Sequence, residues 1–163
     1  MYKRVLVAYD GSREGRTALR EGALLVRQLR AELYVLAVVP ETPGMRVAEG
    51  AYAGAMAYQD DTYRQLLEEA VRGLAKFGLQ VKGKLVRGEP AQEISAYARE
   101  IKADLAVVGH RRQNVLQRWW SGPNGAYLSD YLHCSLLIAR ADISFEDFSR
   151  MMDQEPEVSG SAA

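Results

Sequence analysis

The sequence predicts an α/β fold in which an open, mostly parallel β-sheet has helices on both faces. Five short apolar runs alternate with segments whose apolar residues recur at helical spacing, and this alternation is typical of right-handed β–α–β crossovers. The fourth run opens through Gly109 into a basic loop and the start of a helix. A strand followed by such a turn forms the phosphate crevice of Rossmann-like nucleotide-binding folds.

Each expected strand is an apolar run bounded by turn-forming residues. Residues 4–9 (RVLVAY) are mostly apolar, as in a strand covered on both faces. The second strand is expected at residues 33–39 (LYVLAVV). Residues 79–86 alternate imperfectly, and their lysines favour an edge strand. The fourth and fifth strands are expected at residues 104–109 and Ser135–Ala139.

The segments between the strands have signals of helices. Ser12 is expected to cap the first helix, because its hydroxyl can accept a hydrogen bond from the first turn. Pro90 suits the first turn of the third helix, and Pro123 or a residue nearby is expected to begin the last one. Residues 40–59 are rich in Gly, Ala and Pro and are expected to form a loop or irregular cover, which could include a short helical turn. The residues expected to face the core are Ala18, Gly22, Leu25, Val26 and Leu29, then Tyr63, Leu66, Leu67, Ala70, Val71, Leu74 and Phe77, then Ile94, Tyr97, Ala98 and Ile101, and finally Leu128, Tyr131 and Leu132.

The alternation of strands and helices stops after Arg140. Phe145, Phe148 and Met152 have the spacing of one short helix. Residues 154–163 have almost nothing apolar to bury and are expected to be disordered. The sequence therefore predicts one domain over residues 1–140 and a C-terminal extension over residues 141–163.

The composition argues against several classes of protein. The chain has 21 basic and 21 acidic residues, and this balance does not suit a general nucleic-acid or membrane-surface binder. No apolar run approaches the roughly 20 residues that span a bilayer, and no signal peptide precedes Val5, so we expect a cytoplasmic protein. The single cysteine, Cys134, excludes an internal disulfide framework and is expected to be a packed apolar residue. One cysteine and two histidines, His110 and His133, are too few of the usual ligands for a dedicated zinc site.

Four stretches, in this order and spacing, resemble the universal stress protein family over roughly residues 2–140. They are VLVAYDGS at the end of the first strand, YVLAVVP in the second, VRGEPAQEI followed by ADLAVVG, and Gly122 placed twelve residues before Cys134 in the closing CSLLIAR strand. The resemblance implies a five-stranded parallel sheet in the order 3-2-1-4-5. It also implies a homodimer joined through the fifth strand, Ser135–Ala139, whose apolar edge needs a partner.

The loop after the fourth strand departs from the pattern that the resemblance implies for ATP-binding members: glycine, two residues, glycine, nine residues, then glycine and Ser or Thr. Gly109 and Gly122 match the first and third glycines, whereas Arg112 replaces the second glycine and Pro123 the Ser or Thr. The Arg112 side chain opposes a close approach of the backbone to phosphate, and Pro123 lacks a hydroxyl and an N–H. Two lost hydrogen bonds to charged groups weaken binding by a factor on the order of a hundred to ten thousand. Arg111, Arg112 and Arg118 could recover part of this affinity by charge. Mg-ATP is therefore expected to bind weakly or not at all, or a different anion binds in its place.

The resemblance implies that the rest of the nucleotide crevice is better kept. Asp10 corresponds to an acid near the ribose and phosphates, although an Asp-Gly-Ser turn also has a purely local explanation in backbone capping. Val38 corresponds to a position at the base pocket, and Val38 and Val108 are core valines first and pocket walls second. The candidate nucleotide- or anion-binding residues are Ala8, Tyr9, Asp10, Val38, Val108, Gly109, Arg111, Arg112, Gly122, Pro123 and Asn124.

Three readings of the function stay open. The first is a dimeric binding or regulatory module with an altered ATP crevice and an unknown regulatory protein partner. The second is a true ATP-binding member with slow hydrolysis, although Ser12, Asp10 and His110 lack a nucleophile elbow and no catalytic residue can be assigned. The third is an anion- or partner-binding protein that uses the arginine loop, residues 110–118. Trp119 and Trp120 could stack on nucleic acid beside that loop, but the neutral net charge favours an aromatic anchor or a dimer contact.

Overall fold

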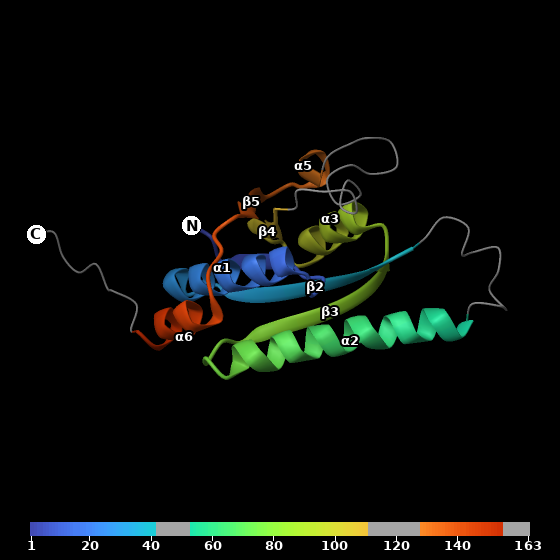
Figure 1. Ribbon diagram of the computed structural model, residues 1–163. Helices are drawn as coiled ribbons and strands as arrows, with labels where there is room; N and C mark the ends of the chain where they lie inside the picture. The colour runs from blue at the N-terminus through green and yellow to red at the C-terminus, as the bar shows by residue number, and fades with distance from the viewer. Residues whose placement is uncertain (42–52, 111–127, 155–163) are drawn as a thin grey trace, which may run out of the picture.

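Five parallel strands form one sheet in the computed structural model, which describes residues 1–41, 53–110 and 128–154 (Figure 1). The predicted α/β class and the strand order 3-2-1-4-5 are both confirmed. The strands are β1 (Arg4–Ala8), β2 (Glu32–Pro40), β3 (Val81–Gly88), β4 (Leu105–Gly109) and β5 (Ser135–Ala139).

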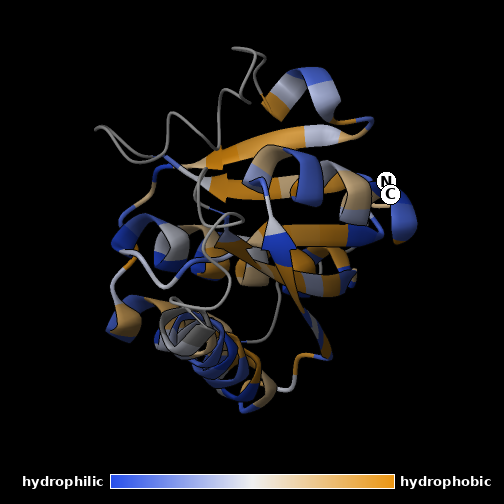
Figure 2. Ribbon diagram, turned by 90° about the vertical axis from the view of Figure 1, so that its right-hand side faces the viewer, coloured by the Kyte–Doolittle hydropathy of each residue, from blue (hydrophilic) through white to orange (hydrophobic). Residues whose placement is uncertain are grey.

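Helices cover both faces of the sheet, as predicted (Figure 1). One face packs against α1 (Arg13–Leu29), α2 (Ala53–Ala75) and α6 (Phe145–Asp153). The other packs against α3 (Pro90–Glu100) and α5 (Leu128–Tyr131). In Figure 2 the strands are mostly hydrophobic, and the helices around them carry both hydrophobic and hydrophilic residues. No helix of the described residues is long and apolar enough to cross a membrane.

The central strand β1 contributes to two separate cores because successive side chains of a strand point to opposite faces. Val5 and Val7 belong to the core shared with α1, α2 and α6, whereas Leu6 and Ala8 belong to the core shared with α3 and α5. All four side chains are buried. A central parallel strand must be apolar on both faces, which explains the continuous apolar run in the sequence.

Side-chain caps fix where two of the helices begin. The Ser12 hydroxyl accepts a hydrogen bond from the Gly15 amide at 3.0 Å, which confirms the predicted cap of α1. The carboxylate of Glu89 accepts one from the Gln92 amide at 3.1 Å, with Pro90 in the first turn of α3 as predicted. These caps satisfy amide groups that have no partner within the helix.

The edge strand β3 begins two residues later than the sequence predicted and follows the long strand β2 to its end. The prediction for residues 79–86 that this is an edge strand carrying lysines is confirmed. Lys82 forms an ion pair with Glu32 at 2.9 Å, and Lys84 forms one with Glu100 at 2.6 Å. Charged side chains of this kind discourage another chain from pairing with an edge.

The predicted loop over residues 40–59 is wrong in its last part, because α2 already begins at Ala53. This end of the helix has the exposed Tyr58 and no buried side chain before Leu67 in the described residues. Without a face to bury, the segment needs no apolar periodicity, and the sequence gives no amphipathic signal. Residues 42–52 lie outside the described residues.

The inward face of α1 differs from the predicted one at its C-terminal end. Ala18, Gly22 and Val26 are buried as expected, but Leu25 is only partly buried and Leu29 is 38% exposed.

The segment after β5 returns to the domain and packs on it. Ser144 caps α6, and Phe148 and Met152 are buried in the core that α1 and α2 form with the sheet. The Phe148 ring meets that of Phe77 edge-on, with centroids 5.2 Å apart. Arg27 of α1 donates a hydrogen bond to the Met151 carbonyl at 2.7 Å. The expected disordered tail falls almost wholly on residues 155–163, outside the described residues.

We expect Phe148→Ala to destabilise the whole fold by about 3–5 kcal/mol, because it opens a cavity in the shared core. Phe145→Ala, on the same helix but at a position that is 61% exposed, is the matched control and should change stability by no more than about 0.5 kcal/mol. Urea unfolding measures both. Equal, small effects would show that α6 does not belong to the cooperative core.

Candidate functional site

The candidate site lies where β1 and β4 end side by side. The two strands are parallel neighbours, with Val5 opposite Leu105 and Val7 opposite Val107. After β1 the chain moves to β2 on one side of the sheet, and only later reaches β4 on the other side. Connections that diverge in this way leave a crevice at the carboxyl ends of the strands, where ligands of α/β proteins bind.

The turn from β1 into α1 is held by its own side chains. The Asp10 carboxylate accepts hydrogen bonds from the Ser12 amide at 2.9 Å and from the Ser12 hydroxyl at 2.5 Å. The same hydroxyl caps α1 through the Gly15 amide, and the Arg16 guanidinium donates to the Gly11 carbonyl at 2.5 Å. Asp10 therefore has the local capping role that the sequence allowed for, and it holds this role at the edge of the crevice.

The end of β4 touches the first turn of α1. A Cβ atom on Gly109 would lie 2.4 Å from the Glu14 carbonyl oxygen and 2.5 Å from its carbonyl carbon. Real Cβ atoms do not come so close to backbone, so this position requires glycine for packing alone. The first glycine of the nucleotide pattern therefore has a structural reason that does not depend on phosphate.

The structure divides the predicted wall residues between the two faces of the sheet. Ala8, Val38 and Val108 are buried together in the core shared with α3 and α5. Tyr9 lies in the opposite core, with α1 and α2. We expected all four residues to line one crevice. The structure has three of them on one face of the sheet and Tyr9 on the other.

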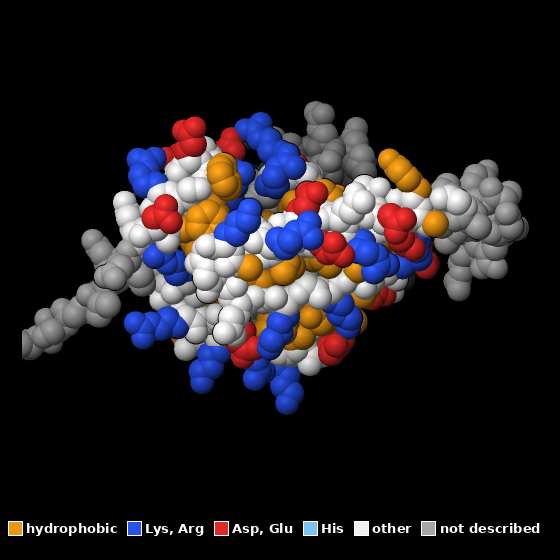
Figure 3. Space-filling model, turned by 90° about the horizontal axis from the view of Figure 1, so that it is seen from below, with side chains coloured by type: hydrophobic (Ala, Val, Ile, Leu, Met, Phe, Trp, Pro, Cys, Tyr) orange, Lys and Arg blue, Asp and Glu red, His pale blue; other side chains and the backbone are white. Residues whose placement is uncertain are grey.

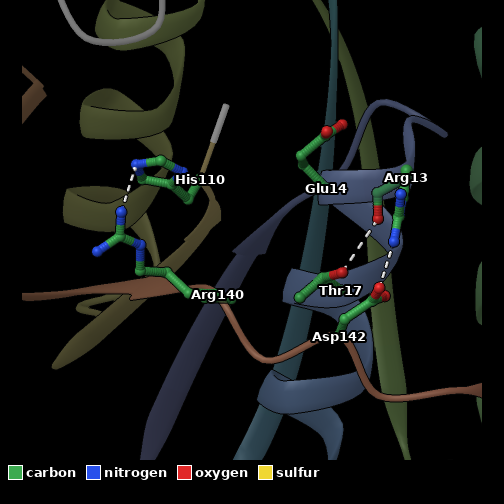
Figure 4. A pocket seen from close by; sticks show the side chains of 7 residues that line it. Arg13, Glu14, Thr17, His110, Arg140 and Asp142 are labelled. Carbon is green, nitrogen blue, oxygen red and sulfur yellow. Dashed lines mark hydrogen bonds and ion pairs between the residues drawn. The ribbon is translucent and has the colours of Figure 1, made fainter. Parts of the chain in front are cut away.

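A polar cleft of about 520 Å³ opens beside the crevice, between the first turn of α1 and the residues that follow β4 and β5 (Figure 4). It is lined by Arg13, Glu14, Thr17, His110, Ala139, Arg140 and Asp142.

One ion pair and one hydrogen bond join charged and polar groups of this cleft. Arg13 forms an ion pair with Asp142, and an Arg140 nitrogen lies 3.0 Å from Nε2 of His110. For the guanidinium to donate here, Nε2 of His110 must be the unprotonated ring nitrogen. The His110 amide also donates to the Ala139 carbonyl at 3.1 Å, which fastens the end of β4 to β5. The cleft can thus hold a polar ligand, to which Arg140 can donate through its remaining N–H groups and His110 through its Nδ1–H.

The sequence did not predict the contribution of Arg13, Arg140 and Asp142 to this end of the sheet. A signal was present, because Arg140 and Asp142 directly follow β5 and the carboxyl ends of parallel strands share one edge.

The remaining candidate residues lie outside the described residues, within residues 111–127. They are Arg111, Arg112, Gly122, Pro123 and Asn124, together with Trp119 and Trp120. Within the parts of the chain that are described, no group of three or more His, Cys, Asp or Glu residues is placed to hold a metal ion.

Cys134 is partly buried just before β5 and packs against the core shared with α3 and α5. Burial raises the pKa of its thiol, so the reactive thiolate is disfavoured. This fits the expectation of a packed apolar residue.

Comparison with known proteins identifies the family. The model of the universal stress protein family matches residues 1–140. The chain belongs to this family. Universal stress protein YxiE of Bacillus subtilis is 30% identical over 151 residues, covering 86% of this chain and all of that protein.

Solved structures agree with this assignment. A universal stress protein family member from Burkholderia pseudomallei superposes with a TM-score of 0.66 at 27% identity, covering 86% of this chain and 97% of that chain. A universal stress protein solved in complex with cAMP has a TM-score of 0.62 at 20% identity and covers 85% of this chain and 97% of that chain. At that identity the second likeness shows the fold.

Replacing Gly109 by alanine should reduce stability by about 1–3 kcal/mol, because the new methyl group overlaps backbone that cannot swing aside. Gly73→Ala is the control. Its Cβ would meet no atom within 4 Å, so the change should stabilise α2 by about 0.5–1 kcal/mol. Urea denaturation of both variants gives the comparison, and a neutral Gly109→Ala would contradict the tight contact with Glu14.

Proposed function

We propose that this universal stress protein is a non-catalytic, nucleotide-responsive binding module that takes an adenine nucleotide at the carboxyl ends of β1 and β4. The observation that carries the proposal is the sheet order, which makes the space between β1 and β4 the switch point of the fold. The relative solved with cAMP supports the class of ligand. The Asp10 turn and the glycine at 109 border the crevice from its two sides.

The sequence of the loop after β4 supports a preference for nucleotides with few phosphates. The positions that would serve the terminal phosphates of ATP have Arg112 and Pro123 in place of glycine and a hydroxyl residue. A ligand without those phosphates makes no contact with these two positions, so the two substitutions do not lower its affinity. Mg-ATP accordingly binds more weakly than it does to members with the full pattern.

The proposed module is a homodimer joined through β5. This strand is at the edge of the sheet, and no described strand pairs with its outer side. Leu136 and Leu137 are only partly buried, and Ile138 is 36% exposed. An apolar edge with open backbone groups is an adhesive surface, and a second copy would cover it.

The polar cleft favours one alternative, an anion-binding protein. Arg140 and His110 lie together at its wall, and Arg13 lies across from them (Figure 4). In this alternative phosphate or sulfate, rather than a nucleotide, is the ligand, and either ion should raise the melting temperature.

Calorimetry with Mg-ATP and AMP tests the nucleotide proposal. Arg112→Gly combined with Pro123→Ser should raise the affinity for Mg-ATP by a factor on the order of a hundred, since it restores two hydrogen bonds to charged oxygens. AMP is the matched control ligand, and its affinity should stay within a few-fold. Low-micromolar binding of Mg-ATP by the natural sequence would contradict the proposed weakening.

A second experiment identifies any nucleotide that is released when the purified protein is denatured. Adenosine monophosphate in the supernatant supports the proposal, and ATP points to an unimpaired ATP-binding member. No nucleotide, no AMP binding and stabilisation by phosphate or sulfate together would replace the proposal by the anion alternative.

Light scattering at micromolar concentration should give the mass of a dimer. Ile138→Asp should shift it to monomer, because a carboxylate would be buried at the strand-to-strand contact. Met151→Asp, which changes an exposed apolar residue of α6, is the matched control and should stay dimeric. A monomeric natural protein would rule out this dimer.

A further inference from the structure

A second cavity, which we call the outer groove, lies on the opposite side of the sheet from Ala8, Val38 and Val108. It has a volume of about 310 Å³ and runs between α1, the C-terminal half of α2, and α6. Its apolar lining is Leu19, Leu74, Phe77, Phe145 and Phe148, with Tyr9 as the buried residue contributed by the end of β1. Figure 3 shows the face on which α2 lies, with apolar side chains exposed between arginines and lysines.

Tyr9 supplies a hydroxyl that the fold does not use. The residue is only 6% exposed, and its side chain makes no hydrogen bond with any described residue. The hydroxyl is not one of the fully buried, unpartnered polar atoms of the described residues, so it is open to the outer groove. Burial of the ring raises the pKa of the phenol, and the protonated hydroxyl can donate a hydrogen bond to a ligand oxygen in the groove.

The rim of the outer groove has an excess of positive charge. Arg16, Arg20 and Lys76 stand against one acid, Glu69. The Arg20 guanidinium donates to the Ile143 carbonyl at 2.6 Å, and Arg16 is held in the same way by the Gly11 carbonyl. Neither arginine forms an ion pair within the described residues. Both are thus oriented by neutral carbonyls and retain their charge for an anion.

We propose that the outer groove binds a small amphipathic acid, with an apolar ring or short alkyl chain on the Leu and Phe side chains and a carboxylate between the Tyr9 hydroxyl and the two arginines. The volume is at the lower end of the range for small-molecule sites, and an apolar lining with few convergent polar groups is their usual character. The charge of the rim selects an acid over a neutral or cationic molecule. This site is separate from the proposed nucleotide crevice and does not depend on it.

Gly73 allows the outer groove to be filled without removing any native contact. It lines the groove, and a Cβ built on it meets no atom within 4 Å. Gly54 is an equally open position on α2, about 28 Å away at the helical rise of 1.5 Å per residue. Gly73→Leu and Gly54→Leu are therefore matched variants, of which only the first should obstruct the site.

The binding experiment uses the full chain and two probes, the fluorescent aromatic sulfonate 8-anilinonaphthalene-1-sulfonate and decanoate. We expect one fluorophore per chain, displaced by decanoate. Gly73→Leu should lower the affinity for both probes by at least about tenfold, and Gly54→Leu should leave both affinities unchanged. Equal affinities in the two leucine variants, or no saturable binding, would overturn the site.

Tyr9→Phe tests the position of the acid group. The affinity for decanoate should fall by about tenfold, the loss typical of one hydrogen bond to a charged group. The affinity for decanol, which has the same alkyl chain and no charge, should change by no more than about twofold. Equal losses for the two ligands would show that the head group does not lie at Tyr9. If decanoate binds only after removal of residues 155–163, the occupant is the chain's own acidic tail, and the proposal fails.

Discussion

Helix α1 lies so close to strands β1 and β4 that two positions between them have room only for glycine. A Cβ on Gly22 would come within 2.6 Å of a Val7 methyl group, and one on Gly109 would meet the backbone of Glu14. The contact at Gly109 places the end of β4 beside the first turn of α1, next to the proposed nucleotide crevice.

The alternation of side chains along β1 distributes two candidate sites over two faces. Ala8 faces α3 and belongs to the core beside the crevice, whereas Tyr9, the next residue, takes part in the outer groove. The same alternation explains why sequence adjacency misled the prediction for Tyr9. A strand end brings neighbouring residues to one edge of a sheet, but it does not bring their side chains to one cavity.

The sequence was most informative where local chemistry alone decides the structure. The limits of β5, the cap at Ser12 and the first turn at Pro90 follow from apolar run length, a hydroxyl and a fixed φ angle, and the structure has all three. The start of α2 could not be found in this way, because none of the side chains described in its first turns is buried. The polar cleft and the outer groove were also missed, since each is assembled from side chains more than a hundred residues apart, such as Arg13 with Asp142 and Tyr9 with Phe145.

The contact between Gly109 and Glu14 restricts how β4 and α1 can shift against each other. Main-chain atoms cannot rotate away as a side chain can, so a displacement of the strand toward the helix at this point would create an overlap. If a nucleotide binds at the proposed crevice, these two elements offer it a pre-formed edge, and the adjustment to the ligand falls to the side chains around it.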